Sequence, residues 1–170
     1  MRALVVYESM FGNTRQVAEA VAGGLRSGME VDVAEVGSAP PTLSDDVHLL
    51  VVGAPTHAFG MSWPRTRQSA AEQANGQRVP TGPGLREWLR SVEVPAGTMS
   101  AAFDTKANRP RLPGSAARGA RRRLARLGCP VLDTANFYVE GVRGPLVAGE
   151  EERAGQWASE LLPRVTGTGG

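Results

Sequence analysis

The chain has 170 residues, of which 41% are hydrophobic and 21% are charged, and its net charge at pH 7 is +2. That size and composition fit one compact domain with a substantial core. No apolar run reaches the roughly 20 residues of a membrane-spanning helix, and the apolar run near the start is too short for a signal peptide. We therefore expect no membrane insertion.

Cysteine and histidine content limits the metal chemistry. Cys129 is the only cysteine, which excludes an internal disulfide and a Cys-rich metal site. His48 and His57 lie too far apart in sequence to indicate a zinc site. We expect a packed thiol, no metal site and a cytoplasmic location.

Apolar patterning in the first part of the chain predicts strands at residues 3–7, 31–36 and 48–52 and a helix at 14–26. The third strand, HLLVV, is apolar without interruption, as is typical of a strand buried on both faces of a parallel sheet. Residues 53–84 are rich in polar residues, Gly and Pro. So long a stretch is usually functional, and we expect it to be partly helical or mobile.

The later part of the chain continues the alternation. It predicts a helix at 85–92, a strand at 98–103, a helix at 115–127, a last strand within 131–139 and a helix that opens with Glu150. A break of the last strand near Asp133 is left open. Residues 166–170 are expected to form a disordered tail.

This alternation predicts an α/β fold over residues 1–165, a doubly wound three-layer sandwich whose parallel sheet has five strands in the order 2-1-3-4-5. Ligands of such sheets bind at the carboxyl ends of the strands, where the strand order reverses between strands 1 and 3. The loops after Tyr7, Gly53 and Phe103 are therefore the candidate binding loops.

The first of these loops, ESMFGNT, leads directly into a helix. It contains neither a Walker Gly-Lys-Ser/Thr nor a G-x-G-x-x-G pattern. Ser9, Asn13 and Thr14 offer hydrogen-bonding side chains beside the free amides and the positive dipole of the helix N-terminus. The loop is thus a neutral candidate site for a phosphate dianion. The alternative is that Asn13 or Thr14 only caps the helix.

The sequence SMFGNT resembles the phosphate loop of flavodoxins, T/S-x-T-G-x-T, except that Phe11 stands where that family commonly has Thr. The resemblance implies a flavodoxin-like fold and FMN as the cofactor. It assigns the phosphate to residues 9–14, namely Ser9, Met10, Phe11, Gly12, Asn13 and Thr14. Loss of one hydroxyl costs one hydrogen bond, about 1 kcal/mol, and would not abolish binding.

The second loop, GAPTHAFGMS, resembles the P-T-x-F-G loop of the FMN-dependent NAD(P)H:quinone oxidoreductases once named tryptophan-repressor-binding proteins. That likeness implies that the flavin ring is lined by Pro55, Thr56, His57, Ala58, Phe59 and Gly60. One extra residue separates Thr56 from Phe59 here. His57 is the catalytic candidate, because an imidazole can stack on the ring or relay protons near neutral pH; the alternative is a solvated loop histidine.

The third loop follows Phe103, Asp104 and Thr105. Flavodoxins often place a Tyr here, against the outer face of the ring, but no aromatic residue follows Phe103. The resemblance implies that Asp104 and Thr105 bond the pyrimidine edge through side chain or backbone. One ring face is then open to a substrate or covered by another subunit.

The net charge of the chain helps to distinguish an electron carrier from an enzyme. Dedicated electron-carrier flavodoxins are strongly acidic, whereas this chain is slightly basic. We therefore expect an FMN-binding redox protein that passes electrons from a reduced nicotinamide or a reductase to a quinone-like or protein acceptor. The alternatives are a dedicated carrier and a flavin-free regulatory module. A response-regulator receiver is disfavoured because only Glu8 follows the first strand.

Seven arginines occur between residues 109 and 126. The ordinary interpretation is a solvated helix face, and an acidic redox partner is an alternative. Arg109 and Arg111 could also bind a nicotinamide dinucleotide phosphate. We expect no nucleic acid, because neither a reading helix nor an aromatic stacking platform is evident. The oligomeric state is left open.

Overall fold

The structure is a computed structural model that describes residues 1–57, 60–72, 82–109 and 113–167. Its elements, in chain order, are β1 (Arg2–Tyr7), α1 (Asn13–Leu25), β2 (Glu30–Glu35), the short 3-10 helix η1 (Val36–Ser38), β3 (Val47–Pro55), α2 (Pro64–Glu72), α3 (Leu85–Ser91), β4 (Met99–Ala107), α4 (Ala116–Arg126), β5 (Val131–Val139) and α5 (Glu150–Thr166).

The described strands form one parallel sheet of five strands in the order β2-β1-β3-β4-β5. The predicted α/β fold and its strand order are therefore confirmed. The chain leaves β1 toward β2 on one side and returns to β3 on the other. The loops that follow β1 and β3 consequently diverge at the carboxyl edge of the sheet, which is where a binding crevice is expected.

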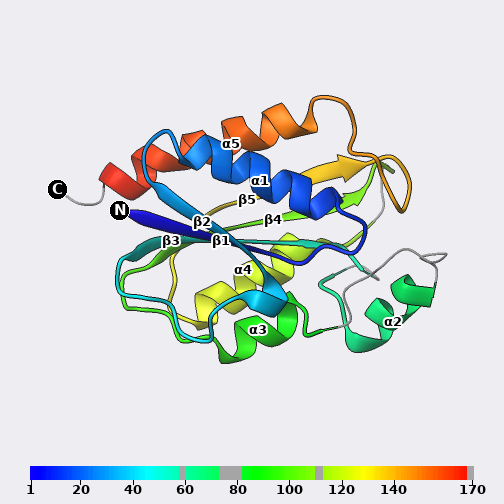
Figure 1. Cartoon of the computed structure of the whole chain (residues 1–170), viewed down its shortest axis with the longest axis horizontal. Coiled ribbons are helices and arrows are strands. Elements are labelled where there is room, and N and C mark those ends of the chain that lie inside the picture. Colours follow the sequence, from blue (N-terminus) through cyan, green and yellow to red (C-terminus); the bar gives the residue numbers. More distant parts are fainter. Residues whose placement is uncertain (58–59, 73–81, 110–112, 168–170) are drawn as a thin grey trace.

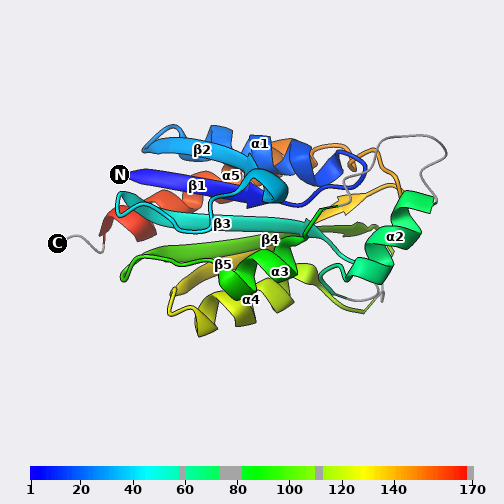
Figure 2. The same ribbon diagram turned by 60° about the horizontal axis from the view of Figure 1, so that its bottom comes forward.

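Helices cover both faces of the sheet. Helices α1 and α5 lie together on one face, and α3 and α4 lie on the other (Figure 1). Each face has its own apolar cluster, one around Val5, Val51 and Phe103 and the other around Val6, Val52 and Leu124. Alternate residues of each strand supply the two clusters. Helix α2 stands apart, beyond the carboxyl ends of the strands (Figure 2).

The strand edges differ from the sequence-based expectation. β3 and β4 each continue to the carboxyl side of the predicted end, to Pro55 and Ala107. β5 is continuous through Asp133, with a shift in its register against β4 between Ser100 and Ala102. Helix α2 supplies the expected helical part of residues 53–84, and α5 extends to Thr166, the first residue of the predicted tail. Residues 168–170 lie outside the described part.

Gly53 is required by close packing between two neighbouring strands. It pairs with Phe103 of β4 in the sheet register. A Cβ atom at position 53 would lie 2.0 Å from Cζ of the Phe103 ring. Phe103 in turn packs edge-on against Phe137 and Trp157, with centroid separations of 6.1 and 6.3 Å. The glycine thus leaves room for the aromatic cluster that joins the sheet to α5.

Substitution of this glycine is expected to destabilise the fold. We predict that Gly53→Ala lowers the free energy of unfolding by about 1–3 kcal/mol, because the new methyl group overpacks the core against Phe103. Urea denaturation followed by circular dichroism measures the change.

The matched control is Gly23→Ala in the exposed part of α1, where a Cβ meets nothing within 4 Å. That variant should gain about 0.5–1 kcal/mol, since alanine favours the helix. Equal stability of Gly53→Ala and the parent protein would refute the packing argument.

Candidate functional site

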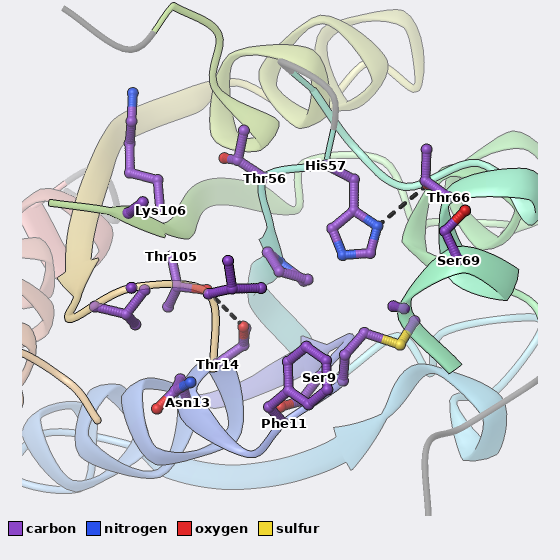
Figure 3. A pocket seen from close by; sticks show the side chains of 17 residues that line it. Ser9, Phe11, Asn13, Thr14, Thr56, His57, Thr66, Ser69, Thr105 and Lys106 are labelled. Atoms are coloured by element: carbon purple, nitrogen blue, oxygen red, sulfur yellow. Dashed lines mark hydrogen bonds between the residues drawn. The ribbon is translucent and has the colours of Figure 1, made fainter. Parts of the chain in front are cut away.

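A cavity of about 310 Å³ lies at the carboxyl edge of the sheet, where the loops after β1, β3 and β4 meet helix α2 and the loop after β5. Figure 3 shows the residues of the first loop on one side and those of the second loop facing them. Its lining consists of Ser9, Met10, Phe11, Asn13, Thr14, Pro55, Thr56, His57, Thr66, Ser69, Ala70, Thr105, Lys106, Ala107, Val139, Gly141 and Val142. Its volume falls at the lower end of the range of ligand sites, about 300–1,000 Å³.

Helix α1 begins at this cavity. Its first intrahelical hydrogen bond runs from the Gln16 amide to the Gly12 carbonyl, at 3.1 Å. The amides of the preceding helical residues, Asn13, Thr14 and Arg15, therefore have no intrahelical acceptor. Gly12 precedes them in the left-handed conformation, with φ of 92°, and makes the sharp entry into the helix. The helix N-terminus thus brings donors and a positive dipole to one end of the cavity.

Hydroxyl groups add to these donors. The Ser9 Oγ accepts from the Gly12 amide at 3.0 Å, which leaves its own O–H to donate. The Thr14 and Thr105 hydroxyls share a buried hydrogen bond of 2.8 Å. One of their two protons lies between the oxygens, so the other is left for a ligand (Figure 3). Two of the expected loops thus meet in one hydroxyl cluster.

Phe11 and Asn13 connect the first loop to residues that sequence reasoning missed. The Asn13 side-chain amide donates to the Arg143 carbonyl at 2.9 Å. The Arg143 guanidinium lies over the Phe11 ring, 5.6 Å from its centroid. A cation therefore stands beside the loop where the flavodoxin pattern would have a hydroxyl. Nothing in the local sequence indicates this pairing, because only the fold brings the loop after β5 back to α1.

The second loop contributes Pro55, Thr56 and His57 to the cavity. The Thr56 amide donates to the Thr105 carbonyl, and its hydroxyl accepts from the Ala116 amide at the start of α4. His57 and Gly60 are joined by two backbone hydrogen bonds of 2.6 and 2.9 Å. Gly60 lines a different cavity, on the α3–α4 side. Ala58 and Phe59 lie outside the described residues, so their expected contacts stay predictions.

His57 is held by helix α2. Its Nδ1 lies 3.2 Å from the Thr66 hydroxyl (Figure 3). In the tautomer in which that hydroxyl donates to the Trp63 carbonyl, Nδ1 donates to Thr66 and Nε2 is the acceptor of the neutral ring. Burial lowers the pKa of His57 below its ordinary value, with a smaller opposing effect of the nearby Glu8 carboxylate. Near neutral pH the imidazole is therefore uncharged and can accept a proton.

Glu8 belongs to a buried network that sequence reasoning also missed. Its carboxylate accepts from the Ser62 hydroxyl at 2.6 Å and from the Leu85 amide at 2.7 Å. The Arg67 guanidinium donates to the same Ser62 hydroxyl at 2.8 Å and pairs with Glu87 of α3. The network ties β1 to α2 and α3. It thereby holds α2, with Thr66 and Ser69, as one wall of the cavity.

Two expected site residues lie elsewhere. The Phe103 side chain is fully buried in the core on the α1–α5 face. The Asp104 carboxylate is fully buried on the other face, where it accepts from Ser115, from the Ala117 amide and from Asn136. Neither side chain lines the cavity, so a contact of these two residues with a ligand would have to come from the backbone, and that contact stays a prediction. Both residues belong to β4: Phe103 packs in the core, and Asp104 binds the first turn of α4. Of the three residues expected from the third loop, Thr105 is the one that lines the cavity.

The lining carries no Asp or Glu side chain within the part of the chain that the structure describes. Lys106 contributes to it, although its ammonium group donates to the Gly114 carbonyl at 2.8 Å. Across residues 1–57, 60–72, 82–109 and 113–167, no cluster of three His, Cys, Asp or Glu side chains could hold a metal ion. None of the described helices is long and apolar enough to span a bilayer.

Comparison with known proteins agrees with this geometry. A sequence model of the flavodoxin family matches residues 5–94, more than half of the chain. No curated protein sequence matches the chain closely enough to count as a relative.

Solved structures share the fold. A flavodoxin from the domain Archaea has a TM-score of 0.65 and 18% identity, over 98% of this chain and 99% of that one. The flavodoxin of Streptococcus pneumoniae TIGR4 has a TM-score of 0.68 and 20% identity, over 96% and 99%. A flavodoxin, WrbA-like protein from Agrobacterium tumefaciens has a TM-score of 0.54 and 18% identity, over 98% of each chain.

The lowered pKa of His57 predicts a pH dependence of stability. The unfolded imidazole takes up a proton near pH 6.5 and the folded one only at lower pH, so the unfolded state binds more protons in that interval. The free energy of unfolding should therefore fall as the pH drops below about 6.5, and His57→Asn should remove that part of the fall. Chemical denaturation at a series of pH values measures both slopes. Identical slopes for the two proteins would show that burial does not disfavour the charged ring.

Proposed function

The chain belongs to the flavodoxin family, and from this premise we propose that it binds FMN in the cavity between the first, second and third loops and works as a redox protein. The family implies a flavin. The observation that carries the proposal is the hydroxyl cluster of Ser9, Thr14 and Thr105 beside the free amides of α1. A phosphate dianion is the group that such a set of neutral donors suits best.

The residues present fit the phosphate end of FMN. Ser9 and the Thr14–Thr105 pair each retain a proton to donate, and Asn13 and Thr14 supply backbone amides. Arg143 lies next to Phe11 and adds positive charge from the loop after β5. The departure at Phe11 therefore exchanges a hydroxyl of the flavodoxin pattern for a stacked guanidinium nearby.

The remainder of the cavity suits a flat, largely apolar ring. Met10, Pro55, Ala70 and Val142 give it apolar walls, and the Thr56 hydroxyl and the His57 ring supply polar contacts. FMN, when bound, supplies the hydride and electron transfer, and the protein orients the reactants. His57, neutral with a free Nε2, is placed to hold or pass a proton at the cavity wall.

The charge of the cavity favours an enzyme over a low-potential carrier. Its described lining carries Lys106 and no carboxylate, and Arg143 is nearby. Negative surroundings are what lower the potential of a carrier's reduced flavin, and they are missing here. The proposed reaction takes electrons from a reduced nicotinamide or a reductase to a quinone-like or protein acceptor.

Discrimination between FMN and riboflavin tests the cofactor site. Ser9→Ala is expected to weaken FMN binding about tenfold or more, because a hydrogen bond to a charged phosphate is lost. Riboflavin lacks the phosphate, so its affinity should stay unchanged. Thr14→Ser keeps the hydroxyl and should retain FMN, while Ser159→Ala on the far face of α5 serves as the matched control. Quenching of flavin fluorescence measures each affinity; equal losses for FMN and riboflavin would argue against the assigned phosphate site.

Steady-state kinetics tests the enzymatic role. The FMN-loaded protein is expected to oxidise NADPH or NADH continuously when a quinone is supplied, followed at the absorbance of the reduced nicotinamide. His57→Asn should lower the rate most where the neutral ring acts, above the His57 pKa. Reduction only by an added reductase protein, with no direct use of either nicotinamide, would favour the carrier instead.

A further inference from the structure

A second cavity, of about 330 Å³, lies on the α3–α4 side of the sheet. Its lining shares no residue with that of the first cavity: His57 lines the first and Gly60 the second. Its lining includes five arginines, which are Arg86, Arg118, Arg122, Arg123 and Arg126. We call it the arginine pocket. Helices α3 and α4, which supply these arginines, lie next to each other in Figure 2.

Helical spacing explains why the arginines gather in one place. Arg118, Arg122 and Arg126 follow one another at intervals of four residues and form one stripe along α4. Leu124 and Ala120, on the opposite stripe, are buried against the sheet. Packing of the apolar stripe therefore leaves Arg118, Arg122 and Arg126 on the exposed side of α4, where they line one cavity together with Arg86 of α3.

These charges have no acidic partners of their own. The ion pairs of the described residues involve Arg2, Arg67 and Arg153, and none involves an arginine of the pocket. The segments outside the described part contain no Asp or Glu, so they cannot supply a side-chain carboxylate. Glu87, the acidic residue next to Arg86, is engaged with Arg67. The pocket is therefore a concave region of net positive charge, which the Glu87 carboxylate offsets in part beside Arg86.

Arg86 is held in place before any ligand arrives. Its Nε and Nη2 donate to the Ser62 and Met61 carbonyls at 3.2 and 2.9 Å. Its guanidinium lies over the Trp63 ring, 3.7 Å from the centroid. Two of its five N–H groups are used in these bonds, which leaves others for a ligand. Burial and the nearby Arg123 lower the pKa of Arg86, a sign that the two cations repel each other.

Uncompensated guanidinium groups around a hollow favour a compact anion with several oxygens. Each group can offer two parallel N–H donors, which match the oxygens of a phosphate better than a single carboxylate on a flat surface. A cavity of about 330 Å³ offers these donors from several sides to one small anion, whereas a folded acidic surface would meet only the exposed arginines of α4. We propose that the arginine pocket is a second anion-binding site, which takes the phosphate groups of a small polyphosphate-bearing ligand.

Inorganic pyrophosphate is the probe for this site. Calorimetric titration of the full chain at low salt, with one equivalent of FMN added to occupy the first cavity, should show one saturable site. Arg122→Gln combined with Arg126→Gln is expected to weaken that binding at least about tenfold, since two charge-assisted contacts are removed. The matched control combines Arg26→Gln with Arg164→Gln, two exposed arginines away from the pocket that remove the same charge. Equal weakening in both double variants would overturn the proposal, because net charge alone would then explain the binding.

The fluorescence of Trp63 offers an independent way to locate the bound anion. It is 47% exposed and in contact with Arg86, whereas Trp88 and Trp157 are buried. Pyrophosphate should therefore change the tryptophan fluorescence of the parent protein, and Trp63→Phe should abolish the change. A fluorescence change that persists in Trp63→Phe would place the anion elsewhere.

Titrations with other ligands identify the molecule that carries the phosphate groups. Binding of NADP⁺ at least about tenfold tighter than NAD⁺, lost in the Arg122/Arg126 double variant, would point to a dinucleotide phosphate. Tight pyrophosphate or ATP with no such preference would point to a free polyphosphate. Arginine-dependent binding of poly-glutamate without binding of pyrophosphate would overturn the proposal in favour of an acidic protein surface.

The site does not depend on the flavin assignment. The Arg122/Arg126 double variant should retain FMN with unchanged preference over riboflavin, because the hydroxyl cluster is untouched. Failure of the parent protein to bind FMN would refute the proposed function and leave the pyrophosphate result standing. Failure to bind pyrophosphate, with FMN still bound, would refute this inference alone.

Discussion

The divergence of the chain on either side of β1 is the constraint on which the site depends. After β1 the chain crosses to β2, and it returns to β3 on the opposite side of β1. The loops that leave β1 and β3 must therefore separate, and no strand closes the space between them. The amino end of α1 projects into that space with its free amides. This feature of the topology places Ser9 and Thr14 at the space, and β4, which pairs with β3, brings Thr105 to them.

Two buried polar systems support the cavity from behind. Asp104 joins β4 to β5 and to the start of α4, and Glu8 joins β1 to Ser62 and α3. Buried carboxylates are costly unless they accept several hydrogen bonds, and each of these accepts at least two. They fix the positions of elements that would otherwise be held by apolar contact alone. The second loop and helix α2 are thereby held against the first loop.

The linings of the two cavities differ in charge. The first joins neutral donors with apolar walls, which suits a phosphate ester on a flat ring. The second is lined by arginines that form no ion pair among the described residues. A hollow with this lining suits an anion. A donor or acceptor with phosphate groups is consistent with both cavities.

Local sequence determined the strands, most helix positions and the strand order, because each depends on the spacing of apolar residues along the chain. It also indicated Ser9, Asn13 and Thr14, which are close together in the chain and do line the cavity; phosphate binding by them stays a proposal. The remaining features, the direction of side chains at the strand ends and the long-range contacts, depend on the tertiary structure. The predicted strand ended at Phe103 and left Asp104 in a loop, but β4 continues to Ala107, and alternation turns the Phe103 side chain into the core and that of Asp104 toward α4. Thr66, Arg143 and Glu8 reach their partners only through packing of segments 9 to 130 residues apart, a relation that no local pattern encodes. The arginines were visible as a cluster, yet their lack of acidic partners became evident only when α3 and α4 were placed side by side.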